Sequence, residues 1–384
     1  MEAVKRERLD SVDLLRGLVM VIMALDHVRD FFHADSQVFS PENLARTNGL
    51  LFFTRWITHF CAPVFVLLAG AGIALSSRNH EGKLSMSNFL ITRGLWLIIL
   101  EHSVMILALS FSIRFDLLIF MVLSAIGGSM IAMAGLIWLP RSAIAIIAAA
   151  MILLHNLLDG VAFPGPVWNF LHLPKQLIIA GIKYRVSYPL IPWIGVLAAG
   201  FLLGDVIRMP EARRRKYLLR IGTGATAGFL VLRLLNLYGD PSPWNGESVM
   251  SFFRVTKYPP SLLYLLMTLG PALLALGFLD RLRVGETNPL RVFGRVPMFY
   301  YVLHFYLIHA LAVMIAGFYY GDWTFLFSLP PALNRSAQGY PAGYGFGLGV
   351  TYMVWVGVVI SLYWPCRWYM RYKQASSAKW TSYV

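Results

Sequence analysis

The sequence predicts an all-α integral membrane protein with about ten transmembrane helices in one bundle and both termini in the cytoplasm. Its 384 residues are 58% hydrophobic and only 14% charged, with a mean hydropathy of +0.62, far outside the range of soluble domains. Apolar runs recur that are long enough to cross the hydrocarbon core, which takes about 17–25 residues. Lys and Arg also collect in alternate connecting segments, as they do in cytoplasmic loops.

Ten apolar segments meet the length requirement. The first follows a basic N-terminus, like a secretory signal, but it carries Arg16, Asp26 and His27 and shows no small-residue cleavage site, so we expect a retained helix. The ten predicted spans cover residues 12–33, 51–77, 86–110, 115–138, 142–158, 188–207, 217–238, 259–280, 293–318 and 346–368. The stretch 161–187 is expected to hold an interfacial or re-entrant helix.

The positions of the basic residues test this count of spans. With the N-terminus inside, 22 of the 33 Lys and Arg residues fall in inner segments and 8 in outer segments. Orientation in the bilayer thus explains the net charge of +14, and no nucleic-acid partner is expected. An even number of spans also keeps the basic tail "RWYMRYK" on the inner side.

No connection between the predicted spans is long enough to form a soluble domain, so one domain over residues 1–384 is expected. Cys61 and Cys366 fall near opposite faces of the membrane and are expected to remain unpaired. Small residues let membrane helices approach closely. Close helix contacts are therefore predicted at Gly127, Gly128, Gly200 and Gly204.

Ionisable residues inside a membrane helix are costly and are candidates for function. The segment "ALDHVRDFFH" places Asp26, Arg29, Asp30 and His33 on one helical face, at i, i+3, i+4 and i+7, with His27 beside it. This cluster is predicted to form the floor of a pocket reached from outside. A carboxylate beside an imidazole makes a candidate general base, and either histidine fits. The structural alternative is an interfacial ion-pair network that anchors the helix end.

Other spans add ionisable groups that could face the bundle interior. Arg55 and His59 share one face of the second span and could pair with the aspartates of the first. Glu101 lies past the middle of the third span, and Tyr300 and His304 share a face of the ninth. Buried histidines and tyrosines often serve only as hydrogen-bonded packing residues, and that alternative applies here.

At the inner end of the bundle, Arg16 could form a helix-start ion pair with Asp13 or one wall of a site for an anionic ligand. Arg295 could bind phosphates, or it could simply meet lipid headgroups. The sequence has no H-E-x-x-H, paired C-x-x-C, P-loop or G-x-S-x-G motif. No metal site is therefore expected.

Several blocks of sequence resemble one known family. The segments "RLDSVDLLRGLVMVIMALDHVRDFF" and "APVFVLLAGAGIAL", both within residues 8–77, resemble the start of the heparan-α-glucosaminide N-acetyltransferase catalytic domain and its bacterial relatives. Blocks similar to those relatives follow at residues 188–205, 257–274 and 293–309. The resemblance thus spans most of the chain, and residues 8–77 are its most family-specific part.

The resemblance implies a transmembrane acyltransferase, here in the cytoplasmic membrane of a bacterium. Such an enzyme moves an acetyl or similar acyl group from cytoplasmic acetyl-CoA to a sugar amine or hydroxyl on the far side. In the lysosomal branch a histidine near the first lumenal loop is regarded as catalytic, with an asparagine nearby on the first helix. Aligning the R-G pairs at Arg16 places His27 on that asparagine and leaves His33 nearest to the catalytic histidine.

The resemblance therefore implies His33 or His27 as base or nucleophile, oriented by Asp26 and Asp30. The acceptor would be positioned by Arg29, Arg55 and His59, the conduit lined by Glu101, Tyr300 and His304, and the CoA phosphates met by Arg16 and Arg295. The expected partners are the lipid bilayer and a glycan or small-molecule acceptor, and a homodimer is a further possibility.

Two other functions fit the same residues. A proton-coupled transporter or channel would use the Asp/His cluster as a proton relay. Inverted internal repeats would favour that alternative, and none is evident in the sequence. In a membrane scaffold, the charges would be purely structural.

Overall fold

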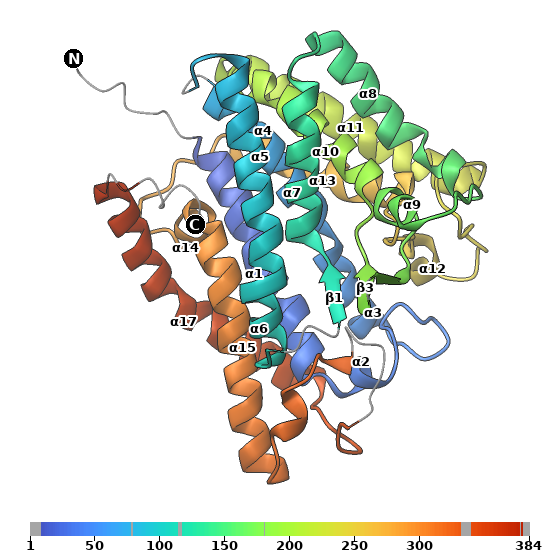
Figure 1. Ribbon diagram of the computed structural model, residues 1–384, viewed down its shortest axis with the longest axis vertical. Helices are drawn as coiled ribbons and strands as arrows, with labels where there is room; N and C mark the ends of the chain where they lie inside the picture. The colour runs from blue at the N-terminus through green and yellow to red at the C-terminus, as the bar shows by residue number, and fades with distance from the viewer. Residues whose placement is uncertain are drawn as a thin grey trace.

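The structure is a computed structural model that describes residues 9–77, 80–113, 117–179, 181–331, 339–376 and 378. It is mostly helical, and the long helices lie side by side in one bundle (Figure 1). Some basic residues counted for the topology lie outside the described residues: Lys5, Arg6, Arg8, Arg78, Arg114, Arg335 and Lys379.

Seven helical segments among the described residues are long and apolar enough to cross a membrane. They are Gly49–Ser76 (α3, η1 and α4), Gly82–Ser110 (α5, η3 and α6), Leu190–Ile207 (α10), Glu211–Leu235 (α11), Leu262–Leu279 (α13), Pro297–Tyr320 (α15) and Leu348–Ala375 (α17). Each coincides with a predicted span, which confirms the helical membrane architecture.

The other three predicted spans correspond to less typical helices. The first is α1 (Asp10–Phe32), which is about 35 Å long at about 1.5 Å per residue but carries charged residues near both ends. The fourth and fifth correspond to α7 (Val122–Leu136) and α8 (Arg141–Leu153), which are apolar but shorter. The count of ten crossings therefore remains a prediction.

The mostly helical structure is consistent with the all-α prediction, but it departs from that prediction in one region, where three strands form a small sheet in the order β1-β3-β2. Strand β1 (Leu117–Phe120) pairs in parallel with β3 (Ile182–Val186), and β2 (Gln176–Ile179) pairs antiparallel with β3. Within the described residues, the span predicted at 115–138 thus starts with a strand and becomes helical only at α7. A four-residue apolar run fits a buried strand as well as a helix, so composition could not separate the two.

The stretch 161–187 was predicted to hold an interfacial or re-entrant helix. It contains α9 (Pro166–Leu171), and the remainder supplies the β2–β3 hairpin. Gly181 lies between the two strands with a φ of 80°, a conformation that glycine adopts readily. The remaining short elements are α2 (Ala34–Val38), η4 (His155–Leu158), α12 (Val249–Phe253), α14 (Pro289–Arg295) and η5 (Thr324–Leu326).

The second span is interrupted about one third of the way along its length. Helix α3 (Gly49–Ile57) and helix α4 (Cys61–Ser76) are joined by the 3₁₀ turn η1 (Thr58–Phe60). Pro63 has no backbone N–H, so it cannot donate to the carbonyl of His59 four residues earlier. The hydroxyl of Tyr264 donates to that carbonyl instead, at 2.9 Å.

The close helix contacts predicted at glycines are confirmed. A β-carbon at Gly200 would collide with the backbone of Leu67, and one at Gly204 with the side chain of Ala74, so α10 lies directly against α4. A β-carbon at Gly127 would collide with the backbone of Gly94. Gly128 similarly faces the side chain of Leu190. Cys61 and Cys366 are both free and buried, as predicted.

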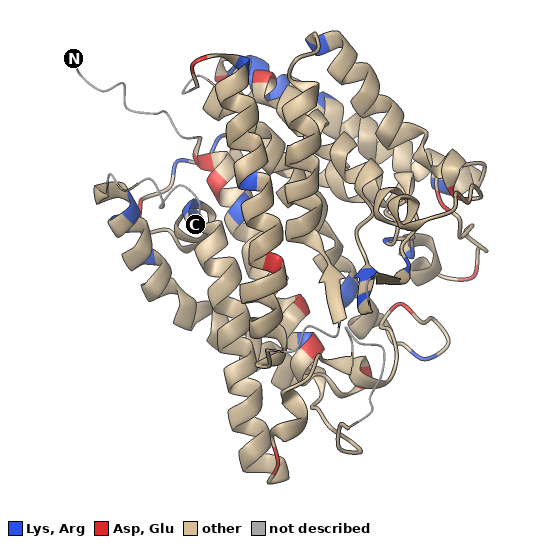
Figure 2. Ribbon diagram, viewed as in Figure 1, with Lys and Arg blue, Asp and Glu red and all other residues tan. Residues whose placement is uncertain are grey.

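Ion pairs tie together the end of the bundle where α1 begins. Asp10 pairs with Arg291 at 3.0 Å, and Asp280 accepts hydrogen bonds from Ser11 at 3.0 Å and from Arg214 at 2.9 Å. Figure 2 shows basic residues along this end of the bundle. These contacts join segments that were all predicted to lie on the inner side.

Candidate functional site

A cavity of about 600 Å³ lies beside the end of α1 that is remote from residue 10. Four residues of the α1 cluster line it: Asp26, His27, Arg29 and Asp30. The opposing walls come from the loop that follows α2, the start of α7, the segment between β3 and α10, residues 257–258 and α15. The cavity thus collects side chains from both halves of the chain.

Arg29 bridges the two aspartates of the cluster. Its guanidinium is 3% exposed and lies 2.8 Å from Asp26 and 2.6 Å from Asp30. Asp26 also accepts hydrogen bonds from Arg55 at 2.8 Å and from the hydroxyl of Thr58 at 2.8 Å. Asp26 is therefore saturated by cationic and hydroxyl donors, which suits a structural anchor better than a general base.

Glu42, from the loop after α2, extends this network. Its carboxylate lies 3.1 Å from Nε of Arg55 and 2.8 Å from Nε2 of His59. Burial by itself raises the pKa of Glu42, but the hydrogen bond with His59 and the charges of Arg55 and Lys257 outweigh burial and hold that pKa well below its usual value. His59 is buried behind Glu42 and is absent from the cavity lining.

His27 is the imidazole that borders the cavity. Its side chain is 18% exposed, and its Nδ1 lies 3.9 Å from an oxygen of Asp30. The ring contacts Phe305 of α15, with ring centroids 4.0 Å apart. The ring thus packs against α15 and is also among the groups that line the cavity. Asp30 is placed to stabilise a positive charge on the imidazole of His27.

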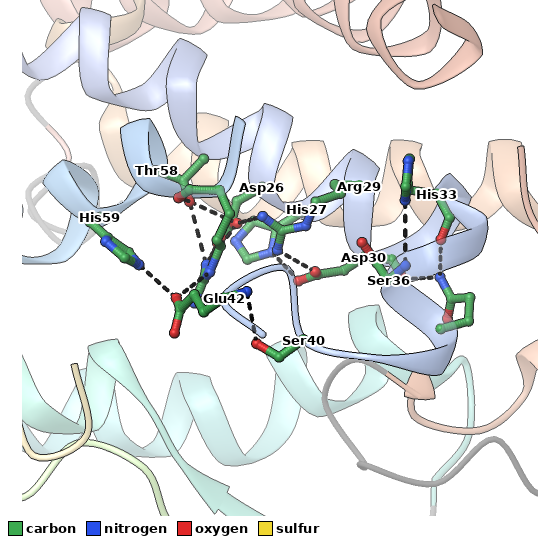
Figure 3. Close-up of polar contacts among 12 residues, drawn as sticks. Asp26, His27, Arg29, Asp30, His33, Ser36, Ser40, Glu42, Thr58 and His59 are labelled. Carbon is green, nitrogen blue, oxygen red and sulfur yellow. Dashed lines mark hydrogen bonds and ion pairs between the residues drawn. The ribbon is translucent and has the colours of Figure 1, made fainter. Parts of the chain in front are cut away.

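His33 lies elsewhere, because α1 ends at Phe32 and His33 is already extended, with φ −86° and ψ 123°. Its Nδ1 accepts a hydrogen bond from the backbone N–H of Ser36 at 3.4 Å and so caps α2. The ring is buried and does not line the cavity. In Figure 3 His33 and Ser36 lie at one end of the row of polar side chains, His59 lies at the other, and His27 lies between them.

Glu101 binds the start of α7, the part of that helix that lines the cavity. It lies in the π-helical turn η3 (Glu101–Met105) and is 1% exposed. Its carboxylate accepts hydrogen bonds from the backbone N–H groups of Met121 (2.9 Å), Leu123 (2.9 Å) and Ser124 (3.1 Å). These N–H groups begin α7 and would otherwise lack partners. Glu101 is thus a helix cap from another segment, and it does not line the cavity.

Replacing Glu101 with glutamine is expected to lower the free energy of unfolding by about 1–3 kcal/mol, because the amide turns donors toward N–H groups that need an acceptor. Thermal unfolding in detergent measures the change. Glu211→Gln is the matched control, since Glu211 is 47% exposed in its pair with Arg283. Equal melting temperatures for Glu101→Gln and wild type would contradict the capping role.

The aromatic face of α15 lies against His27 from inside the bundle. The ring centroid of His304 lies 5.3 Å from that of His27, and the Nδ1–H of His304 donates to the carbonyl of Tyr300 at 3.1 Å. Nε2 of His304 and the hydroxyl of Tyr300 have no hydrogen-bond partner among the described residues. Tyr301 and Phe305 line the cavity, whereas His304 and Tyr300 lie behind them.

Arg16 and Arg295 both reach Asp13, at 3.5 Å and 3.4 Å. Arg16 also donates to the carbonyl of Gly294 at 3.1 Å. Arg16 precedes His27 by eleven residues of α1, or about 16 Å along the helix. The structure therefore separates the predicted phosphate contacts from the cavity by a large part of α1.

The ligand atoms of Asp26, His27 and Asp30 lie within 4.8 Å of one another, a spacing that a metal ion could bridge. Both aspartates, however, have the guanidinium of Arg29 within 2.8 Å. A metal ion would have to displace or repel that charge. The donor set therefore fits ion pairing better than metal binding.

Sequence reasoning missed cavity residues that lie outside the regular α-helices. Among them are Glu42, Thr58, Arg185, Lys257 and Tyr258. Thr58 and Glu42 complete the ion-pair network, and Lys257 was used only to count charges in outer segments. Residues in loops, in a short 3₁₀ turn or in a short strand have no α-helical periodicity that could assign them to a face, so the sequence carried no comparable signal for them.

Residues 8–236 match the family model described as "Heparan-alpha-glucosaminide N-acetyltransferase, catalytic". The match covers more than half of the chain and confirms the resemblance. The chain belongs to this family. It is thus an integral membrane protein of an acetyltransferase family. No curated protein matches the sequence. The cavity wall formed by Lys257, Tyr258, Tyr301 and Phe305 lies beyond the matched residues.

Proposed function

We propose that the protein is a transmembrane acyltransferase that moves an acetyl or similar acyl group from cytoplasmic acetyl-CoA to a sugar amine or hydroxyl. The acceptor binds in the cavity at the extracytoplasmic end of α1. The observation that carries this proposal is the position of His27, which borders the cavity with Asp30 at 3.9 Å, in a chain of this acetyltransferase family.

In this proposal His27 is the general base. Its imidazole takes the proton from the acceptor nitrogen or oxygen as that atom attacks the thioester carbonyl. The tetrahedral intermediate then collapses, the C–S bond breaks, and the CoA thiolate takes up the proton. Transient acylation of His27 itself is the second route open to the same imidazole. Asp30 stabilises the imidazolium in the first route.

In this proposal, Arg29 and Arg55 hold the acidic residues of the site in position. Arg29 holds Asp26 and Asp30, and Arg55 connects Asp26 with Glu42. We assign them to positioning the site, with Arg55 also facing the acceptor. His59 fixes Glu42, and His304 and Tyr300 support the ring of His27. His33 is assigned to the cap of α2, and Arg16 and Arg295 to the CoA phosphates at the inner end.

The proposed orientation uses ten crossings, with both termini in the cytoplasm and the whole chain as one domain. Ion pairs between segments that the charge distribution places on the same side support it, including Asp10 with Arg291 and Asp280 with Arg214. The same orientation puts the cavity outside and the basic end of the bundle inside. A bacterial cytoplasmic membrane fits it.

The test is to incubate purified protein in detergent with acetyl-labelled acetyl-CoA and glucosamine, glucosamine derivatives or neutral sugars. Labelled acetyl sugar and an equal amount of free CoA are expected. A sample without acceptor separates transfer from thioester hydrolysis. If acetyl-CoA does not bind at all, the acyltransferase proposal fails, and failure of every sugar with bound acetyl-CoA would rule out a sugar acceptor among those tested.

A further inference from the structure

Helix α11 packs against the bundle along one side and leaves its other side exposed. A β-carbon at Gly222 of α11 would lie 2.8 Å from the backbone nitrogen of Leu274 in α13. Likewise, a β-carbon at Gly270 of α13 would lie 2.7 Å from the backbone nitrogen of Thr226. In the most apolar stretch of α11, 22% of the residues are buried, whereas 61% are buried in that of α13. The side of α11 that faces away from α13 therefore meets the membrane or a partner within it.

This exposed side of α11 begins with three cations. Arg213, Lys216 and Arg220 lie at i, i+3 and i+7, and all three side chains are exposed. Residues at this spacing share one face of a helix. None of the three has an ion-pair partner among the described residues. We call these three residues the basic face of α11.

Two acidic residues at this end of α11 are already paired with other arginines. Glu211 lies 2.7 Å from Arg283. Asp280 accepts hydrogen bonds from Arg214 at 2.9 Å and from Ser11, at the start of α1, at 3.0 Å. The contact with Ser11 also shows that α11 begins at the basic end of the bundle (Figure 2). An anion for the basic face is therefore expected from outside the described chain.

The same face of α11 becomes apolar after Arg220. Four exposed residues without charge continue it at helical spacing: Gly224, Ala227, Val231 and Leu234. Leu234 follows Arg220 by fourteen residues, or about 21 Å along the helix, which is most of the about 30 Å of the hydrocarbon core. One continuous face thus offers cations at the level of lipid headgroups and apolar surface at the level of acyl chains.

We propose that this face of α11 is a docking site for an anionic phospholipid of the leaflet at the basic end of the bundle. The phosphate lies among the three cations, and the acyl chains lie along the apolar part of the face. Basic clusters beside a membrane helix attract anionic headgroups. A zwitterionic headgroup fits less well, because its own cation faces the arginines. None of these residues lines the cavity, so the proposal does not depend on the acyltransferase function.

The test compares phosphatidylglycerol with phosphatidylcholine of the same acyl chains. Native mass spectrometry of the purified full-length protein in neutral detergent measures the dissociation constant of the first bound lipid. Wild type is expected to bind phosphatidylglycerol about tenfold more tightly. The triple variant Arg213→Gln, Lys216→Gln and Arg220→Gln is expected to reduce this preference to about threefold or less, because the apolar surface remains but the charges are lost.

Two further triple variants are the controls for this loss. Arg213→Lys with Lys216→Arg and Arg220→Lys keeps the three charges and is expected to keep the preference. Lys175→Gln with Lys183→Gln and Arg254→Gln removes the same charge from exposed residues of segments predicted to lie on the outer side. It is also expected to keep the preference.

Three results would overturn the docking site. The first is a wild type without preference for phosphatidylglycerol. The second is a glutamine variant of α11 that keeps the preference with a wild-type melting temperature. The third is an equal loss in the outer-segment variant, which would show attraction to the net charge alone. If the triple glutamine variant does not fold, the single variants Arg213→Gln and Arg220→Gln decide, and each is expected to lose part of the preference.

The same spectra identify two other occupants of this face. Glycerophosphoglycerol, the headgroup without acyl chains, is expected to bind far more weakly than the whole lipid. If it binds as tightly, the face holds a soluble phosphate and the lipid proposal is wrong. A doubled protein mass that the α11 glutamine variant splits would show that a second copy of the chain covers the face instead. Because no acyl donor is present, these results are separate from those of the transfer assay.

Discussion

Replacing His27 with alanine is expected to lower the rate of acetyl transfer by about 10²–10⁴-fold, the range in which a positioned general base contributes. His27 is the histidine among the described residues that lines the cavity. Its removal leaves the Arg29 bridge between Asp26 and Asp30 in place, so the fold should be retained. Transfer to the best acceptor at saturating acetyl-CoA measures the effect, with the melting temperature recorded for each variant.

His33→Ala is the matched comparison, because it removes an imidazole six residues away that is buried outside the cavity. It is expected to retain most of the transfer rate. Asp30→Asn is expected to give an intermediate loss, since an amide keeps the shape but cannot stabilise the imidazolium. A rate that falls with His33→Ala and survives His27→Ala would reverse the assignment of the two histidines.

The second large effect is expected on stability. Arg29→Met is expected to reduce the free energy of unfolding by about 3–5 kcal/mol, the range for breaking a buried ion pair by removing one partner. Without Arg29, the carboxylates of Asp26 and Asp30 would lose the charge that lies within 2.8 Å of each. Methionine keeps the length of the side chain, so the change isolates the charge. Thermal or denaturant unfolding in detergent measures it.

Arg141→Met is the control for this experiment. Arg141 lies 2.6 Å from Asp205, as short as the contact between Arg29 and Asp30, but the two side chains are 51% and 41% exposed. Exposed pairs of this kind contribute about 0–1 kcal/mol. Equal losses of stability in the two variants would show that burial does not set the strength of the Arg29 bridge.

The long helices were predictable because their apolar runs far exceed the length of a strand. The close helix contacts at glycines were predictable because glycines recur in the sequence at a recognisable spacing. The strand at Leu117–Phe120 was not predictable, because four apolar residues before a helix are too few to show the alternating pattern of a strand. Its pairing with Ile182–Val186 joins segments more than sixty residues apart. Only tertiary contact decides such a pairing.

In the candidate site, the sequence correctly placed Asp26, Arg29 and Asp30 on one face, because i, i+3 and i+4 positions adjoin on any regular helix. It could not separate His27 from His33, because that depends on the residue at which α1 ends. One turn more of helix would have kept His33 on the face of Asp26. Glu42 and Lys257 could not be placed at all, since loop closure brings them to the cavity.

The break in the second span gives Tyr264 an influence on a cavity that it does not line. The carbonyl of His59 is satisfied by the Tyr264 hydroxyl of α13, so the angle between α3 and α4 is fixed partly by a side chain from another helix. Arg55, on α3, would move with that angle. Substitutions in α13 that shift this angle would therefore change the size of acceptor that the cavity admits. The charged residues of the site would stay the same.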